Sequence, residues 1–412
     1  MDVRAALALT LALIGPAGAT AGTEFTAALA GAPALAAARH RLDAAQARAG
    51  TRGRLADLEL EAMGTSLRDP GIGGRREAYE LTLRQPLPRP RERAADRALG
   101  ATALRLAEAE LALTAADLAA TVAGLLAEST AARERAAVSL GQAARLETAL
   151  GGLEARLSAS GTTALVERLA LQSRRTALRL AAAEDERTAA DAEAEARARL
   201  GLAPDAPLPA FAAPEPTAIQ PAETAAAALA RARAEDAEAG ARFARASAGA
   251  TTAVGLRMER ERMGSGFLNG VGLVVSTDLP SRRAAAARAE VRAAAADRAA
   301  AQADEDASRL LARSDLDRAA RAATFATEAR RLAAEITSRL EAEHEAVNRA
   351  LAAARPGQDS ALLHALDILD RTTAARLQVI AADAERRARE AALWRHAPPA
   401  TLLAAVARGP AP

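Results

Sequence analysis

The chain has 412 residues, of which 50% are hydrophobic but only 2% aromatic, with 54 basic against 52 acidic side chains and no cysteine. Globular cores bury large aromatic and aliphatic side chains, so an apolar fraction carried by Ala and Leu argues against ordinary compact domains and favours long helices and coiled coil. The charge balance leaves no broad basic field for nucleic acid, and the lack of Cys excludes disulfides, thiolate metal sites, a Cys nucleophile and lipoprotein acylation.

The N-terminus has the pattern of a secretory signal peptide. An Arg within the first four residues precedes an apolar run over 5–14, which a Gly-Pro pair ends. Small residues follow, so cleavage is expected after Ala19 or Ala21. A buried first helix is the alternative interpretation. The run is shorter than the roughly 18 apolar residues that a spanning helix needs, and we expect no membrane-spanning helix elsewhere. Residues 1–21 are therefore predicted to be removed on export.

The two halves of the mature chain repeat one order of elements: a short helix, a β-hairpin, a very long helix, a tight turn and a second long helix. We expect the repeats over 22–200 and 222–397, a Pro-rich linker over 201–221 and a flexible C-terminal tail over 398–412. The stretch that begins at Ala164 also aligns with the one that begins at Ala361, which supports a duplication.

The long helices carry a period of seven residues. Leucines repeat at this interval in the first half, and Phe325 and Leu332 repeat it in the second; the leucines are Leu104, Leu111, Leu118 and Leu125. A strict period of seven keeps a narrow apolar seam against partner helices. The expected helices over 91–150 and 281–355 would be about 90 and 110 Å long, at about 1.5 Å per residue.

Two segments, 57–85 and 253–279, are predicted to form β-hairpins. Polar and apolar residues alternate along them, and Gly-rich breaks lie near 71–74 and 264–266. One apolar and one charged face suit a transmembrane β-barrel, with a soluble hairpin packed on a helix as the alternative. Four strands are too few to close a membrane barrel, since the smallest have about eight. If the strands span a membrane, several copies must share one barrel.

No complete catalytic, cofactor or metal motif occurs in the sequence. The pair His344-Glu345 begins a zincin pattern, but Asn348 stands where the second His is required. The glycines at 264, 266 and 270 do not match the dinucleotide-binding spacing. We therefore expect no enzyme activity, no catalytic residues, no cofactor and no metal site.

The order of elements and several short motifs resemble the TolC-type outer-membrane efflux proteins, over about 25–396. The carrying segments are 32–35 (APAL), 83–88 (LRQPLP), 270–273 (GVGL) with 278–280 (DLP), and Gly357 with 362–367 (LLHALD). The resemblance implies a mainly α fold. Long coiled-coil helices would form a periplasmic α-helical barrel, and two hairpins per chain would contribute to a shared trimeric transmembrane β-barrel.

The resemblance also implies a function. The chain would be a homotrimeric outer-membrane channel of a tripartite efflux system, surrounded by outer-membrane lipid and extending into the periplasm. A periplasmic adaptor and an inner-membrane transporter would be its partners, and no nucleic acid is expected. The competing interpretation is a periplasmic structural coiled coil or adaptor without a membrane barrel, which leaves the two hairpins unexplained.

The resemblance further implies a periplasmic mouth at the helical turns. The family often places acidic residues there, and the corresponding positions are Glu167, His364 and Asp367, which we expect to line the pore. A solvated helix face is the alternative. Membrane barrels also carry aromatic girdles, for which this chain offers Tyr79 and Phe267.

Overall fold

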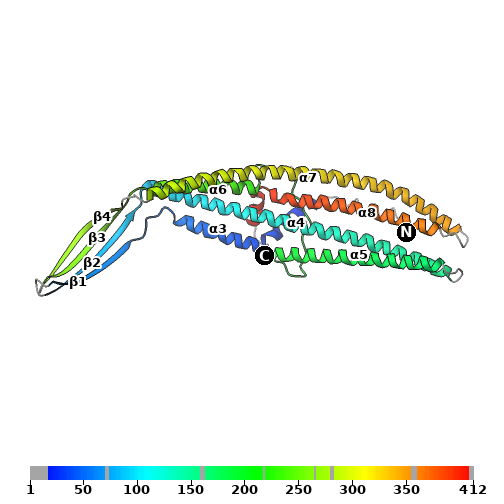
Figure 1. The fold of residues 1–412 in the computed structure, drawn as a ribbon, viewed down its shortest axis with the longest axis horizontal. Helices are drawn as coiled ribbons and strands as arrows, with labels where there is room; N and C mark the ends of the chain where they lie inside the picture. Colours follow the sequence, from blue (N-terminus) through cyan, green and yellow to red (C-terminus); the bar gives the residue numbers. More distant parts are fainter. Residues whose placement is uncertain are drawn as a thin grey trace. The chain divides into compact units, whose positions relative to one another are not determined.

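The protein is described by a computed structural model that covers residues 17–69, 74–157, 163–216, 219–263, 266–278, 283–353 and 360–407. Its contacts divide the chain into two compact units, each drawn from both halves of the sequence. The first unit contains 1–37, 111–226 and 308–412, and the second contains 38–110 and 227–307. Figure 1 shows the elements coloured along the chain.

Long helices make up most of the structure, which confirms the mainly α fold. The helices are α2 (Ala17–Ala30), α3 (Pro33–Thr51), α4 (Pro90–Leu157), α5 (Thr163–Leu200), α6 (Ala225–Ser247), α7 (Arg283–Ala353), α8 (Ser360–Ala392), the 3-10 turn η2 (Leu393–His396) and α9 (Pro399–Ala407). α4 and α7 reach 68 and 71 residues because good helix formers fill them and no Pro interrupts them after Pro90, which takes the first helical position of α4.

Helix α4 differs from the sequence expectation in one respect. The stretch 90–148 is long and apolar enough, by length and composition, to cross a membrane, whereas we expected no such helix. A run of small residues in it is fully buried, including Ala112, Ala116 and Ala123. Small side chains let neighbouring helices approach closely, so the part of this stretch from residue 111 onward behaves as a core helix of the first unit.

The first unit also buries parts of the expected linker and tail. The rings of Phe25 and Trp394 lie 5.3 Å apart, and Trp394 Nε1 donates a hydrogen bond of 2.8 Å to the carbonyl oxygen of Ala212. Ile219 packs with Leu393 in one apolar cluster. The Pro-rich segment is thus held against the turn η2 by both apolar contact and a hydrogen bond.

The expectation of a flexible tail over 398–412 is wrong for its first part. Residues 399–407 form α9, which contacts α2, and Leu402 is only 2% exposed. Pro399 is the first residue of this helix, where a backbone N–H would have no partner within the helix, so its absence loses no hydrogen bond. Helix α2 itself runs across both expected cleavage sites, Ala19 and Ala21, while residues 1–16 lie outside the described part.

A glycine ends α5 and starts the Pro-rich segment. Gly201 has φ +70°, a left-handed conformation that favours Gly, and its neighbour Leu202 donates its N–H to the carbonyl of Arg197 at 2.9 Å. A Cβ on Gly201 would lie 2.9 Å from Pro33, so the end of α5 also approaches the start of α3 closely. The segment after α5 therefore leaves in a direction that only Gly permits at low cost.

An ion pair between Arg387 and Glu134 joins α8 to α4 in the first unit. Arg387 donates two hydrogen bonds to Glu134, of 2.7 and 3.1 Å, and this hydrogen bonding raises the pKa of the Arg387 guanidinium. The Arg387 side chain is only 17% exposed. By contrast, Arg389 pairs with Glu385 on its own helix and both side chains are exposed.

We expect Arg387→Ala to destabilise the helical unit by about 2 kcal/mol, because it leaves Glu134 without its bidentate partner in a half-buried place. Arg389→Ala should cost at most about 0.5 kcal/mol, as exposed pairs on one helix do. Thermal unfolding followed by circular dichroism compares the two variants. Equal midpoints would show that the Arg387 pair contributes no more than a surface pair.

The second unit contains a four-stranded antiparallel sheet. Its strands are β1 (Glu59–Asp69), β2 (Gly74–Leu87), β3 (Thr251–Met263) and β4 (Gly266–Asp278), in the order β1-β2-β3-β4. The two predicted hairpins are therefore confirmed, and they also pair with each other through β2 and β3. β1 and β4 are the terminal strands, so the sheet has two edges.

Candidate functional site

The sheet has one apolar face along its middle. The register aligns side chains of the four strands in rows, and alternate rows lie on the same face. The first apolar row consists of Leu60, Leu83, Leu256 and Leu273, and the second of Ala62, Leu81, Met258 and Val271. Val254 and Val275 extend this apolar face toward the helices.

These apolar side chains are exposed. Leu273 is 82% exposed, Val271 69% and Leu60 66%, and the leucines of the two central strands are about two fifths exposed. A soluble protein seldom exposes a continuous apolar area of this kind unless it binds something apolar. The apolar face therefore requires another copy, another protein or lipid to cover it.

The opposite, polar face carries charged side chains in the intervening rows. Between the rows of Glu59 and Thr65 it holds five glutamates and two arginines, namely Glu59, Glu61, Glu80, Glu259, Glu261, Arg84 and Arg257. The excess is three negative charges per chain in these rows. Strands with one apolar and one charged face have the alternation of a membrane barrel wall, with lipid on one side and water on the other.

Ion pairs across strands hold this polar face together. Arg84 lies 2.9 Å from Glu61, and Arg257 lies 2.8 Å from Glu80 and 3.7 Å from Glu259. Glu80 and Glu259 are direct cross-strand partners. Like charges placed opposite each other destabilise a sheet, so Arg257 between them offsets that repulsion.

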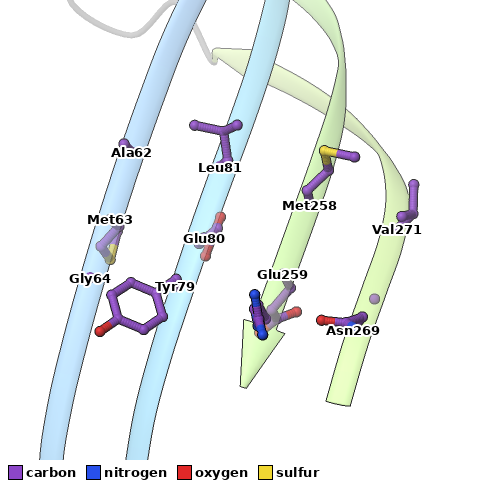
Figure 2. A pocket seen from close by; sticks show the side chains of 12 residues that line it. Ala62, Met63, Gly64, Tyr79, Glu80, Leu81, Met258, Glu259, Asn269 and Val271 are labelled. Carbon is purple, nitrogen blue, oxygen red and sulfur yellow. The ribbon is translucent and has the colours of Figure 1, made fainter. Parts of the chain in front are cut away.

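Aromatic side chains lie toward the hairpin ends of the apolar face. Figure 2 shows the ring of Tyr79 turned toward β1 beside Gly64, and a Cβ on that glycine would lie 3.7 Å from the ring. Phe267 lies on the same face as Tyr79, and the Arg260 guanidinium stands 4.2 Å from its ring centre. These two aromatics were expected from the sequence to serve as a girdle, and they border the apolar rows on the side of the hairpin turns.

A shallow hollow of about 510 Å³ crosses all four strands at this level. Figure 2 shows its lining, which includes Met63, Glu80, Leu81 and Met258. The lining includes residues from both faces of the sheet. Among the described residues, no group of three or more His, Cys, Asp or Glu side chains is placed to hold a metal ion.

The three residues expected at the mouth lie in the first turns of two helices. Glu167 belongs to α5, and His364 and Asp367 belong to α8. The side chains of Glu167 and His364 lie outside the described part of the chain. The Asp367 carboxylate is 48% exposed and lies 2.8 Å from Arg371, one turn further along α8.

Three ion pairs between helices near this end were not expected from the sequence. Asp370 pairs with Arg174 and thereby joins α8 to α5. Glu147 of α4 lies 2.8 Å from Arg179 and 3.4 Å from Arg175, both on α5. The i,i+4 spacing could have revealed the Arg371 pair, whereas the contacts between helices depend on packing that no local pattern encodes.

The chain is similar in fold to solved outer-membrane channels over nearly its whole length. The outer-membrane channel OprN is 19% identical, over 92% of this chain and 89% of its own, with a TM-score of 0.70. VceC of Vibrio cholerae is 15% identical over 95% and 97% with a TM-score of 0.70, and the open state of Neisseria gonorrhoeae MtrE is 16% identical over 94% and 90% with a TM-score of 0.69. At these identities the likeness shows a shared fold. A scan against family models and a search of curated proteins gave no match.

Proposed function

We propose that this chain is the outer-membrane channel of a tripartite efflux system and passively conducts substrates delivered by an inner-membrane transporter and a periplasmic adaptor. The observation that carries the proposal is the sheet, whose exposed apolar face and charged opposite face suit lipid outside and water inside. The shared fold with outer-membrane channels over nearly the whole chain supports it. An exported chain, beginning after Ala19 or Ala21, is part of the proposal.

The proposed channel is a homotrimer. Open sheet edges leave backbone groups without partners, which lipid does not tolerate, so β1 and β4 must pair with other copies. Three copies would bring twelve strands into one closed barrel. The helices offer a second contact, because Phe325, Leu332 and Ile336 form an exposed apolar stripe along α7. Two of these residues continue the period of seven that predicts partner helices.

The alternative is a periplasmic coiled coil or adaptor without a barrel. This alternative accounts for the long helices and for export. It leaves the apolar face of the sheet exposed to water, however, which is energetically unfavourable. Fractionation of the expressing cell separates the two. We expect the protein in the outer membrane, released only by detergent, and as an oligomer that resists dissociation. A protein recovered free from the periplasm as a monomer would contradict the channel.

We further propose that the starts of α5 and α8 form the periplasmic mouth, with Glu167, His364 and Asp367 lining it. Three copies would repeat the acids around the opening, and such rings of carboxylates attract cations. Because Arg371 already pairs with Asp367, the carboxylate is partly neutralised and its effect should be modest.

We expect Asp367→Asn together with Glu167→Gln to weaken block by divalent cations about two- to five-fold in single-channel recordings, since the ring loses two carboxylates per chain. Arg371→Gln is the matched opposite change, because it frees the Asp367 carboxylate and should strengthen the block. Unchanged block in both variants would place these side chains on an ordinary solvated surface.

A further inference from the structure

An arginine-rich region lies within the second unit, where the strands join the helices. Two adjoining hollows of about 860 and 680 Å³ open there and share Arg245 in their linings. Six arginines line them: Arg89, Arg91, Arg242, Arg245, Arg288 and Arg292. The other lining residues are Ala, Val and Pro, so the two hollows combine positive charge with an apolar floor. Glu92 and Glu290 line a third, smaller hollow of about 370 Å³.

Two of the six arginines already have partners within the protein. Arg89 donates to the carbonyl oxygen of Ala246, and its guanidinium occupies the space that a Cβ on Gly249 would need. Arg242 donates a hydrogen bond of 2.6 Å to Glu238. The larger hollow is lined instead by Arg245, Arg288 and Arg292, and all three are exposed. These three are the arginines that a bound anion would meet.

The hollows adjoin the end of the apolar sheet face. That face continues on β2 as far as Leu87, which is exposed and lies two residues before Arg89. In Figure 1, α6 ends close to the start of β3, and α7 follows β4 along the chain. Arg245 lies near the end of α6 and Arg288 near the start of α7. If the apolar face meets hydrocarbon, these arginines lie at the adjacent boundary between membrane and water. Phosphate groups of lipids lie at that depth.

We propose that Arg245, Arg288 and Arg292 bind the phosphate groups of anionic phospholipids in the membrane leaflet that faces the helices. Guanidinium groups match phosphate oxygens with paired hydrogen bonds, and the Ala and Val floor accommodates the adjoining part of the lipid. The proposal rests on the proposed function, since it needs the sheet to span a membrane. Each arginine near an anionic surface contributes about a five-fold factor, so three arginines contribute on the order of one hundred-fold.

Native mass spectrometry of the full-length oligomer tests the proposal, with phosphatidylglycerol or phosphatidylcholine added to the detergent. The variant R245Q/R288Q/R292Q removes the charge of the larger hollow. R298Q is the matched control, because Arg298 lies on the same helix α7, near Glu238 at 3.8 Å, and lines neither hollow. We expect the wild type and R298Q to retain phosphatidylglycerol in preference to phosphatidylcholine. The triple variant should lose that preference by at least about ten-fold.

Three results would overturn the proposal. Equal retention of phosphatidylglycerol by the triple variant and R298Q would show that the arginines do not bind it. Displacement of the lipid by inorganic phosphate would indicate a site for a free anion. Dissociation of the triple variant in both lipids would make the hollow an interface between copies. Ion conduction by the wild type in phosphatidylcholine bilayers tests the proposed function separately. Failure of the lipid-binding proposal can therefore be distinguished from failure of the channel proposal.

Discussion

Leu273→Arg should remove the protein from the outer membrane, whereas Gly272→Arg should leave it there. The two residues are neighbours on β4 and lie on opposite faces of the sheet. Leu273 belongs to a row of four leucines on the apolar face, and an arginine at the middle of a barrel's lipid face costs about 2–4 kcal/mol. Three copies would carry the same cost, so assembly should fail.

Gly272→Arg is the matched control because it adds the same side chain to the polar face. A Cβ on Gly272 meets no atom within 4 Å, so the larger residue has room. Outer-membrane recovery of oligomer, measured by fractionation and gel mobility without heating, compares the variants. If both variants reach the membrane equally, or if only Gly272→Arg is lost, the face that we assign to lipid is wrong.

Glu80→Gln combined with Glu259→Gln should strongly reduce cation preference in planar bilayers. In the polar-face rows from Glu59 to Thr65, the five glutamates exceed the two arginines by three charges per chain, which would make nine in a trimer. Removing both carboxylates leaves Arg257 without its two partners and reduces the excess to one charge per chain. Fixed charge on a pore wall concentrates the opposite ion, so the cation-to-anion permeability ratio should fall several-fold.

The reversal potential under a potassium chloride gradient gives this ratio directly. Glu77→Gln is the control, because Glu77 lies on the other face of the same strand β2. It should leave the reversal potential unchanged. A double variant with the wild-type ratio would mean that the polar face does not line the conducting path.

Much of this architecture can be predicted from local patterns. The alternation of polar and apolar residues identified both hairpins, and the long Ala- and Leu-rich stretches identified α4 and α7. The strands extend beyond the alternating segments, since Gly64 and Thr65 interrupt the apolar pattern of β1 while the backbone pairing continues through them. The pairing of β2 with β3 joins segments far apart in the chain, and no local pattern encodes it.

Local sequence patterns also fail to predict contacts between helices that are far apart in the chain. Helix α9 was expected to be a flexible tail, because its short apolar sequence gains stability only from contact with α2. The link between Arg174 and Asp370 likewise depends on how α5 and α8 pack. By contrast, the pair of Asp367 with Arg371 follows from their spacing on one helix, and it reduces the charge that a sequence-based account assigns to the mouth.

In the proposed channel, β1 of one copy pairs with β4 of the next to close a barrel of three chains. The chain has no cysteine, so any disulfide must form between cysteines that are introduced to test this contact. Met63→Cys on β1 is combined in turn with Leu268→Cys, Gly270→Cys or Gly272→Cys on β4, all on the polar face. Opposed side chains of paired strands lie about 4.5–5.5 Å apart at Cβ, within reach of a disulfide after a small adjustment.

Oxidation in the outer membrane should give covalent dimers and trimers in at least one combination and nothing larger, because a ring of three is closed. Only monomers in every combination, or a ladder that continues beyond the trimer, would contradict the shared barrel.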